Sequence, residues 1–249
     1  MTKTTTAWAL AALAACSFTT GAVAQEGKAA DEGFVFTTVK ENPITSIKNQ
    51  NKSGTCWAYS SLGYFEAELL RLGKGEYNLC EMFLAHKTYE DRAKAAVRMH
   101  GDISFTEGGS FYDAVYCMKN YGMMPEEAMP LPGTLYGDSL ANFNEMWPVA
   151  AGVVSAITDG KLTKLSPAWF SGLNAVLDAY LGQVPGEFTF KGKKYTPKSF
   201  QESLGLKMDD YVSLTSFTHH PFYTQFVIEV QDNWRWGLSY NIPIDELMK

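Results

Sequence analysis

The sequence has few of the residues that usually define a metal site or a disulfide framework. It contains four cysteines and four histidines in 249 residues. The cysteines are scattered, without a C-x-x-C pair and without the paired spacing of a zinc site. This scarcity argues against a zinc module, a redox dithiol and a disulfide scaffold, and we expect neither a metal nor a cofactor.

Basic runs, repeats and low-complexity tracts are also absent. The formal net charge is −6, and an acidic chain without a basic run argues against nucleic-acid binding. Hydrophobic residues make up 46% of the sequence, which is enough to build a sizeable core. The composition therefore indicates a globular protein that acts on something other than nucleic acid.

No apolar run is long enough to cross a bilayer in the mature chain, but the N-terminus is typical of an export signal. A short apolar run, AWALAALAACSF, follows Lys3, and the small-residue sequence AVA ends at Ala24. We therefore expect a signal peptide over residues 1–24 and a periplasmic or extracellular protein. Because LAAC resembles a bacterial lipobox, a lipoprotein anchored at Cys16 is the alternative.

Cleavage after Ala24 leaves an odd number of cysteines in the mature chain. The remaining thiols are Cys56, Cys80 and Cys117, so at least one of them has no partner within the chain. We expect Cys80 and Cys117 to be core residues carried by helices. The question is then what Cys56 does.

Hydrophobic periodicity predicts a mainly helical chain with a few short strands. The predicted helices cover about residues 57–70, 81–99, a segment ending at Gly122, 139–157 with an interruption near Pro148, 166–182, and the start of IPIDELMK. The predicted strands are FVFTTV at residues 34–39, a hairpin around Gly192, and PFYTQFVIEV at residues 221–230.

The stretch NQNKSGTCWAYS places Cys56 directly before a long helical pattern. The first turn of a helix presents free N–H groups and a positive dipole end, and a thiolate is the reactive form of cysteine. Gln50 can fold its amide back beside the thiol, and Gly54 lets the loop or a substrate approach closely. The Cys56 N–H and the Gln50 amide can therefore stabilise an oxyanion. The alternative is a buried packing thiol.

NQNKSGTCWAYS resembles the active-site segment of papain-like cysteine peptidases (family C1), and is most similar to the bleomycin hydrolase/aminopeptidase C branch. The resemblance implies that Cys56 is the nucleophile, that Gln50 belongs to the oxyanion hole, and that Trp57 packs behind the thiol. Ser53 stands where papain has its first cysteine, a departure that is typical of this branch.

Two further segments extend the resemblance. LCEMFLAHKTYEDRAKAAVRMHG resembles the second helix of the branch, where serine is usual at the position of Cys80. FTEGGSFYDAVYCMKNYGMMPEEAMP resembles the substrate-cleft loop and the helix that follows it. The resemblance implies that Gly108 and Gly109, together with Trp57, bind an extended peptide through backbone hydrogen bonds.

The resemblance implies an α+β, papain-like fold with a helical half, a helical insertion and only the start of the β half. The expected organisation is a signal peptide at 1–24, a flexible lead-in at 25–33, the nucleophile subdomain at 34–132, a mostly helical insertion at 133–210, and an incomplete β subdomain at 211–249. Members of this branch form homohexamers, so the resemblance also allows a homo-oligomer.

A papain-type thiol needs a histidine base and an asparagine that orients it. We expect His86 and His100 to be surface residues, and the THHP stretch with His219 and His220 matches the family histidine poorly. In the branch, the histidine and asparagine lie in a segment beyond the equivalent of Lys249. The expectation is therefore a C-terminally truncated chain that lacks its base, with His219 or His220 as the fallback.

Two function classes follow from these observations. The first is an exported cysteine peptidase, of the aminopeptidase type, that cleaves peptide substrates with Cys56. The second is a non-catalytic peptide-binding or structural protein with the same fold, which the missing base favours.

Overall fold

A computed structural model of the chain describes residues 34, 36–131, 140–160 and 162–249. The predicted signal peptide, its lipobox alternative at Cys16 and the lead-in at 25–33 lie outside the described residues. The chain divides into two units, Met1–Glu41 and Asn42–Lys249. Each unit is described by itself below.

In the first unit, the described residues of FVFTTV form no strand. Phe34, Phe36 and Val39 are almost fully exposed there. The prediction of a strand is wrong for these residues, because alternation favours a strand only where a second strand completes the ladder, and none of the described strands pairs with them.

The helices of the second unit are α1 (Cys56–Arg71), α2 (Glu81–Arg98), α3 (Phe111–Tyr121), α4 (Phe143–Thr158), α5 (Ala168–Leu181), α6 (Pro197–Leu204) and α7 (Ile244–Leu247), with 3-10 turns at Glu126–Ala128 and Met208–Asp210. The sequence predicts these helices except α6, and it does not predict the 3-10 turns. Gly122 and Gly182 end α3 and α5 as predicted. The hydroxyl of Ser166 accepts a hydrogen bond from the Ala168 N–H at the start of α5.

Helix α4 runs through Pro148 without the predicted interruption. Pro148 lies in the second turn, where its missing N–H removes a single bond near the start of the helix. The rest of the hydrogen-bond ladder continues to Thr158.

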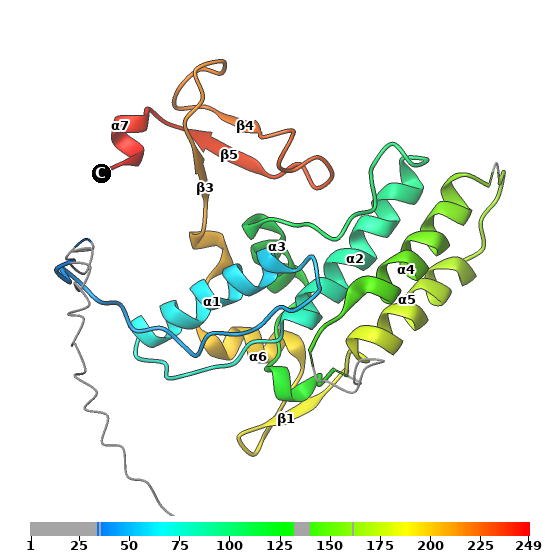
Figure 1. The fold of residues 1–249 in the computed structure, drawn as a ribbon, viewed down its shortest axis with the longest axis horizontal. Helices are drawn as coiled ribbons and strands as arrows, with labels where there is room; N and C mark the ends of the chain where they lie inside the picture. Colours follow the sequence, from blue (N-terminus) through cyan, green and yellow to red (C-terminus); the bar gives the residue numbers. More distant parts are fainter. Residues whose placement is uncertain (1–33, 35, 132–139, 161) are drawn as a thin grey trace, which may run out of the picture. The chain divides into compact units, whose positions relative to one another are not determined.

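Helix α2 is the centre of the core, since it packs against α1, α3, α4 and α5. Figure 1 shows α4 and α5 side by side next to α2. The fully buried side chains that join these helices include Leu62, Phe65, Leu69, Leu84, Tyr89, Met118, Met146 and Leu177. Each such side chain contributes roughly 1.5–3 kcal/mol relative to an exposed one, so the helical core holds the unit together.

Two cysteines belong to this core, as the sequence predicts. Cys117 is buried on α3, and Cys80 is buried at the N-cap of α2, where its Sγ accepts a hydrogen bond from the Phe83 N–H. Burial raises the pKa of Cys80 to about 12 and also raises the pKa of Cys117. Both thiols are therefore protonated and shielded at neutral pH.

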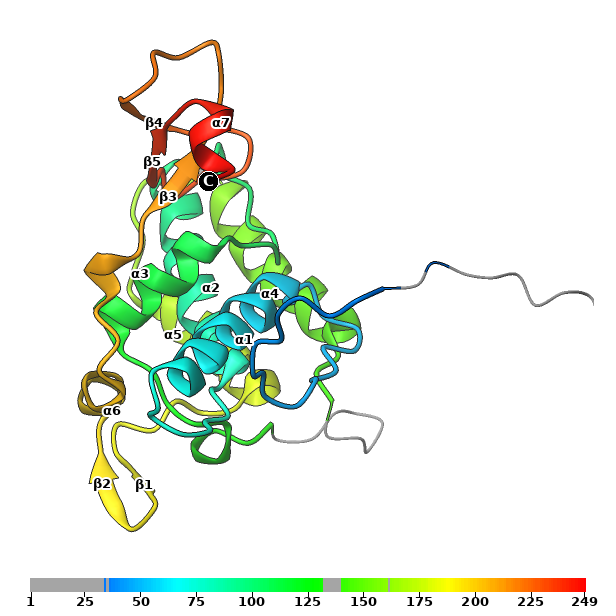
Figure 2. The same cartoon turned by 90° about the vertical axis from the view of Figure 1, so that its left-hand side faces the viewer.

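The strands form two small sheets. β1 (Phe188–Phe190) and β2 (Lys193–Tyr195) make the predicted hairpin, with Lys191 and Gly192 both at positive φ in its turn. β3 (Ser213–Thr215) pairs parallel with β5 (Leu238–Asn241), and β4 (Gln225–Val227) pairs antiparallel with β5. Figure 2 shows the hairpin and the three-stranded sheet at opposite ends of the unit. The mixture of helices and sheets agrees with the predicted α+β class.

Among the helices of the described residues, none is both long and apolar enough to cross a bilayer.

Candidate active site

Cys56 is the first residue of α1, and its side chain is exposed. Thr55 precedes it as N-cap, but no side chain caps the helix. The first backbone N–H groups of α1 are therefore left without a capping side chain beside the thiol. Cys56 therefore differs from Cys80 and Cys117, whose side chains are both buried.

Gln50 folds back onto the loop that leads into Cys56. Its Nε2 donates a hydrogen bond of 2.7 Å to the Ser53 carbonyl, and the Ser53 hydroxyl donates one of 2.8 Å to the Gln50 carbonyl. Ser53 Oγ also lies 2.5 Å from Thr55 Oγ1. Since an amide nitrogen has two hydrogens, one N–H of Gln50 remains for another acceptor. No hydrogen bond joins Gln50 to the Cys56 thiol among the described residues.

Lys48 fixes the extended segment before Gln50 to two helices. Its Nζ lies 2.8 Å from Glu66 on α1 and 2.7 Å from Glu81 at the start of α2. Glu66 also accepts hydrogen bonds from the Thr45 hydroxyl and the Leu79 N–H. These interactions anchor residues 45–48, and they limit the freedom of Gln50 two residues later.

The loop that contains Gly108 and Gly109 packs against the start of α1. The Trp57 indole N–H donates a 3.1 Å hydrogen bond to the Glu107 carbonyl, and the Tyr89 hydroxyl donates another of 3.0 Å to the same oxygen. A Cβ at position 109 would lie 2.6 Å from the Trp57 ring, so Gly109 is required by this close approach. Residue 108 faces open space and is exposed.

Arg92 on α2 also binds this loop through two backbone carbonyls. Its Nε donates to the Ser104 carbonyl at 2.9 Å, and its Nη1 donates to the Gly108 carbonyl at 2.5 Å. Ser110 then caps α3, and its hydroxyl and N–H both donate to Asp113 Oδ2. The glycine pair is therefore held between an arginine and a capping box.

Arg235 lies far along the sequence from α3, and it binds the aspartate that caps this helix. Arg235 Nε lies 2.6 Å from Asp113 Oδ1, and its Nη1 lies 3.1 Å from Asp91 Oδ2. Its guanidinium also lies over the rings of Tyr116 and Trp234. Asp113 therefore joins Arg235 to the cap of α3 next to Gly109.

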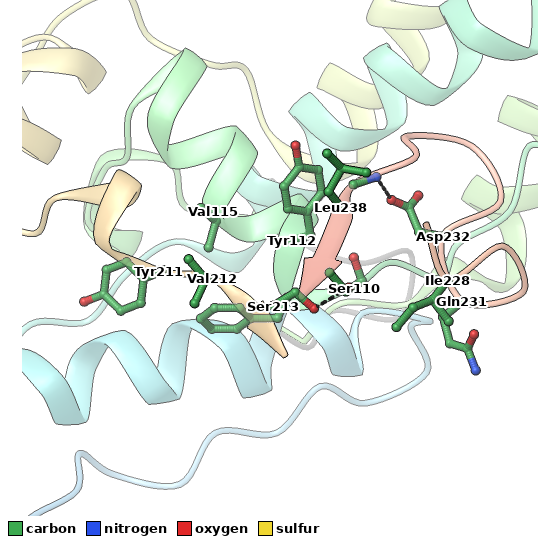
Figure 3. Close-up of a pocket in the computed structure, with 13 residues that line it drawn as sticks. Ser110, Tyr112, Val115, Tyr211, Val212, Ser213, Ile228, Gln231, Asp232 and Leu238 are labelled. Atoms are coloured by element: carbon green, nitrogen blue, oxygen red, sulfur yellow. Dashed lines mark hydrogen bonds between the residues drawn. The ribbon is translucent and has the colours of Figure 1, made fainter. Parts of the chain in front are cut away.

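A cavity of about 150 Å³ is lined by Ser110, the residue that follows the glycine pair. It lies between the start of α3, the β3–β5 edge of the sheet and the segment 228–239. Figure 3 shows Tyr112 against Leu238 on its wall, with Val115 from the same helix and Ser110 from the cap of that helix. The wall is mostly apolar, so the cavity can take an apolar group.

The structure brings no histidine into contact with Cys56 among the described residues. His86 is 2% exposed, with ring nitrogens 2.9 Å from Asp178 and from Glu90, so the prediction of a surface residue is wrong. It is buried because α5 covers this face of α2. His100 is exposed, as predicted.

His219 and His220 lie beside the three-stranded sheet. The His220 ring stacks on Phe226 at 3.9 Å between centroids, and Asn241 Nδ2 donates to the His220 carbonyl at 3.0 Å. His219 packs its ring on Phe217 and Phe226. Neither histidine contacts the thiol loop.

Within the described part of the chain, no three His, Cys, Asp or Glu side chains cluster in a way that could hold a metal ion.

The chain is similar to three bacterial proteins that are named as aminopeptidases. It is 24% identical to aminopeptidase G of Lactobacillus delbrueckii subsp. lactis, over 86% of this chain and 57% of the relative. It is also 24% identical to aminopeptidase E of Lactobacillus helveticus and to aminopeptidase W of Lactobacillus delbrueckii subsp. lactis, over 86% and 81% of this chain. The chain spans little more than half the length of these relatives. No family model matches the sequence.

The fold is similar to the crystal structure of PepW from Lactobacillus rhamnosis HN001 (DR20). The TM-score is 0.61 at 18% identity, and the match covers 85% of this chain and 56% of that one. The α+β fold is therefore one that a solved bacterial protein also has.

Sequence reasoning missed the residues that support the glycine pair. Glu107 directly precedes Gly108, which is a signal that could have singled it out. Arg92 and Arg235 gave no such signal, because their partners are set by the packing of α2 and α3.

Proposed function

We propose that this chain carries the nucleophile half of an exported, papain-like cysteine peptidase of the aminopeptidase type. The observation that carries the proposal is the packing of the Gly108–Gly109 loop on Trp57, next to the exposed Cys56. The similarity to proteins named aminopeptidases supports the reaction class. Peptides are the proposed substrates.

In the proposed reaction, Cys56 Sγ attacks the peptide carbonyl carbon. The Cys56 N–H and the free N–H of Gln50 bind the oxyanion as the tetrahedral intermediate forms. The amine then leaves with a proton, and water hydrolyses the thioester to release the acid and regenerate the thiol. Gly108 and Gly109 align the peptide, and the adjoining cavity takes an apolar side chain of the substrate.

No histidine of the described residues is placed to act as the base in this reaction. His86 is engaged by carboxylates in the core, and His219 and His220 pack beside the sheet. His219 or His220 remains the fallback base, and it would require the 217–221 loop to leave its contacts with Asn241.

A non-catalytic peptide-binding or structural role is the second candidate. The observation that favours it is the lack of any hydrogen bond or ion pair between Cys56 and a histidine among the described residues. Such a protein would use the same glycine loop and cavity, and its thiol would be inert.

The test is hydrolysis of aminoacyl-coumarin amides by the complete gene product and by the present chain. We expect the complete product to be active, Cys56→Ser to abolish the activity, and Gln50→Ala to lower kcat by about 10²–10³. Activity that survives in C56S would overturn the proposal. Peptide binding with no hydrolysis in the complete product would establish the second candidate.

A further inference from the structure

The carboxylate of Glu107 lies on the wall of the thiol loop. Its Oε2 accepts a 2.6 Å hydrogen bond from the Gly54 N–H. A Cβ at position 54 would lie 2.5 Å from the Glu107 Cβ, so glycine is needed for this approach. Gly54 and Cys56 have Cα atoms no more than about 7.6 Å apart, because consecutive Cα atoms are 3.8 Å apart. The carboxylate is therefore fixed beside the reaction centre of the proposed function.

The backbone of Glu107 is held as firmly as its side chain. Its carbonyl accepts hydrogen bonds from the Trp57 indole and from the Tyr89 hydroxyl. Burial raises the pKa of Tyr89, and the nearby Glu107 carboxylate acts in the same direction. The Tyr89 hydroxyl therefore lies close to both the backbone and the charge of Glu107.

Glu107 has no cation of its own among the described residues. Its Oε1 makes none of the hydrogen bonds or ion pairs there, and it is not one of the buried unpaired atoms. The neighbouring buried carboxylates are satisfied in other ways: Glu66 and Glu81 by Lys48, Asp91 and Asp113 by Arg235, and Asp232 by the N–H groups of Arg235 and Gly237. Glu107 is left with one oxygen that faces solvent next to the exposed Gly108.

We infer that Glu107 is a specificity-determining residue that binds a cationic group of the substrate, an ammonium or a guanidinium, beside Cys56. The cation would supply the charge partner that Oε1 lacks, while the hydrogen bond from Gly54 to Oε2 keeps the carboxylate in place. The inference rests on the proposed function for its assumption that peptides reach Cys56. The cation is either the free α-amine of a peptide or a basic side chain next to the scissile bond.

The test uses thiol labelling of the full chain, which needs no hydrolysis. Rates of disulfide formation at Cys56 are measured by mass spectrometry with aminoethyl methanethiosulfonate, a cation, and with neutral methyl methanethiosulfonate. Dividing the two rates cancels the intrinsic reactivity of the thiol. Glu107→Gln is compared with Glu68→Gln, which removes the same charge near the other end of α1, where Glu68 pairs with Arg71.

We expect the ratio of cationic to neutral rates to fall about three- to tenfold in E107Q at low salt, and to stay unchanged in E68Q. The wild-type ratio should also fall as ionic strength rises. An equal ratio in wild-type and E107Q overturns the inference. If E107Q does not fold, a wild-type ratio that is insensitive to salt overturns it in the same way.

Protection of Cys56 from labelling separates the two sources of the cation. Leucinamide carries only an α-ammonium, Nα-acetyl-lysinamide carries only a side-chain ammonium, and N-acetyl-leucinamide carries neither. Protection by one of the first two, lost in E107Q, identifies the group that is recognised, and equal protection by all three overturns the inference. A protein that hydrolyses peptides through Cys56 yet shows no change in E107Q refutes only this inference, and an inactive protein with the expected ratios refutes only the proposed function.

Discussion

Gly109 shows how a single missing Cβ shapes the surface beside Cys56. Its φ is not in the left-handed region, so backbone freedom is not the reason for glycine. The reason is the Trp57 ring, which occupies the place that a Cβ would need. Gly108, one residue earlier, has open space at the same position. The two glycines therefore form a matched pair for mutation.

Gly109→Ala should lower the free energy of unfolding by about 1–3 kcal/mol, because either Trp57 or the loop must move. Gly108→Ala should change it by less than about 1 kcal/mol, since its Cβ meets no neighbour. Urea denaturation followed by tryptophan fluorescence measures both values. Equal losses in the two variants would show that Trp57 does not restrict this loop.

At the residue scale, local signals in the sequence singled out the residues of the proposed site. Cys56, Gln50, Trp57 and the glycine pair lie in short segments with recognisable spacing, and the structure places Trp57 and Gly109 in contact. The prediction failed for His86, because the burial of a helical residue depends on how many neighbours the helix acquires. Helix α2 acquires four, and α5 covers the face that carries His86.

At the scale of the elements, an ion-pair cluster around Lys48 connects the segment before Gln50 to two helices. Lys48 joins an extended segment to α1 and α2 through Glu66 and Glu81. Burial raises the pKa of Glu81 from 4.5 to about 7, although Lys48 acts in the opposite direction. The folded protein therefore binds a proton at Glu81 more tightly than the unfolded chain does.

Glu81 should make stability depend on pH between about 4.5 and 7. In this range Glu81 is protonated in the folded state and ionised in the unfolded state. Its contribution to the free energy of unfolding therefore falls as pH rises, by about 1 kcal/mol per pH unit. Above pH 7 this contribution no longer changes with pH. Glu81→Gln should remove this slope. Urea titrations of both proteins at pH 5, 6, 7 and 8 test it, and identical slopes would contradict the raised pKa.

The helices themselves were largely predictable from sequence. Periodicity and terminal glycines located α1, α2, α3 and α5 to within one or two residues at their predicted ends. The hairpin at Gly192 was equally clear, since its turn needs two residues with positive φ. FVFTTV misled because a strand depends on a partner that local sequence does not reveal.

At the scale of the whole unit, Arg235 joins the segment before β5 to the helical core. It is 122 residues from Asp113 and 144 from Asp91 in sequence. Its side chain is only 8% exposed. No local pattern could have predicted these pairs, because they form only once the segment before β5 packs beside α2 and α3.

Arg235→Ala should lower the free energy of unfolding by about 3–5 kcal/mol, because it leaves two carboxylates without their cation. Asp91→Asn with Asp113→Asn in the same chain should restore part of the loss. Guanidinium denaturation, followed by far-UV circular dichroism, measures these values. A loss below about 1 kcal/mol in R235A would show that Arg235 does not anchor the segment.

The most direct test of Cys56 as a substrate-directed nucleophile is labelling by leucyl chloromethyl ketone, compared with chloroacetamide and normalised to glutathione. We expect a single adduct on Cys56, absent in Cys56→Ser, with the leucyl group raising the rate at least tenfold. Cys80 and Cys117 should remain unlabelled, because both are buried. Equal labelling of Cys56 and Cys117, or no gain from the leucyl group, would contradict the role of Cys56.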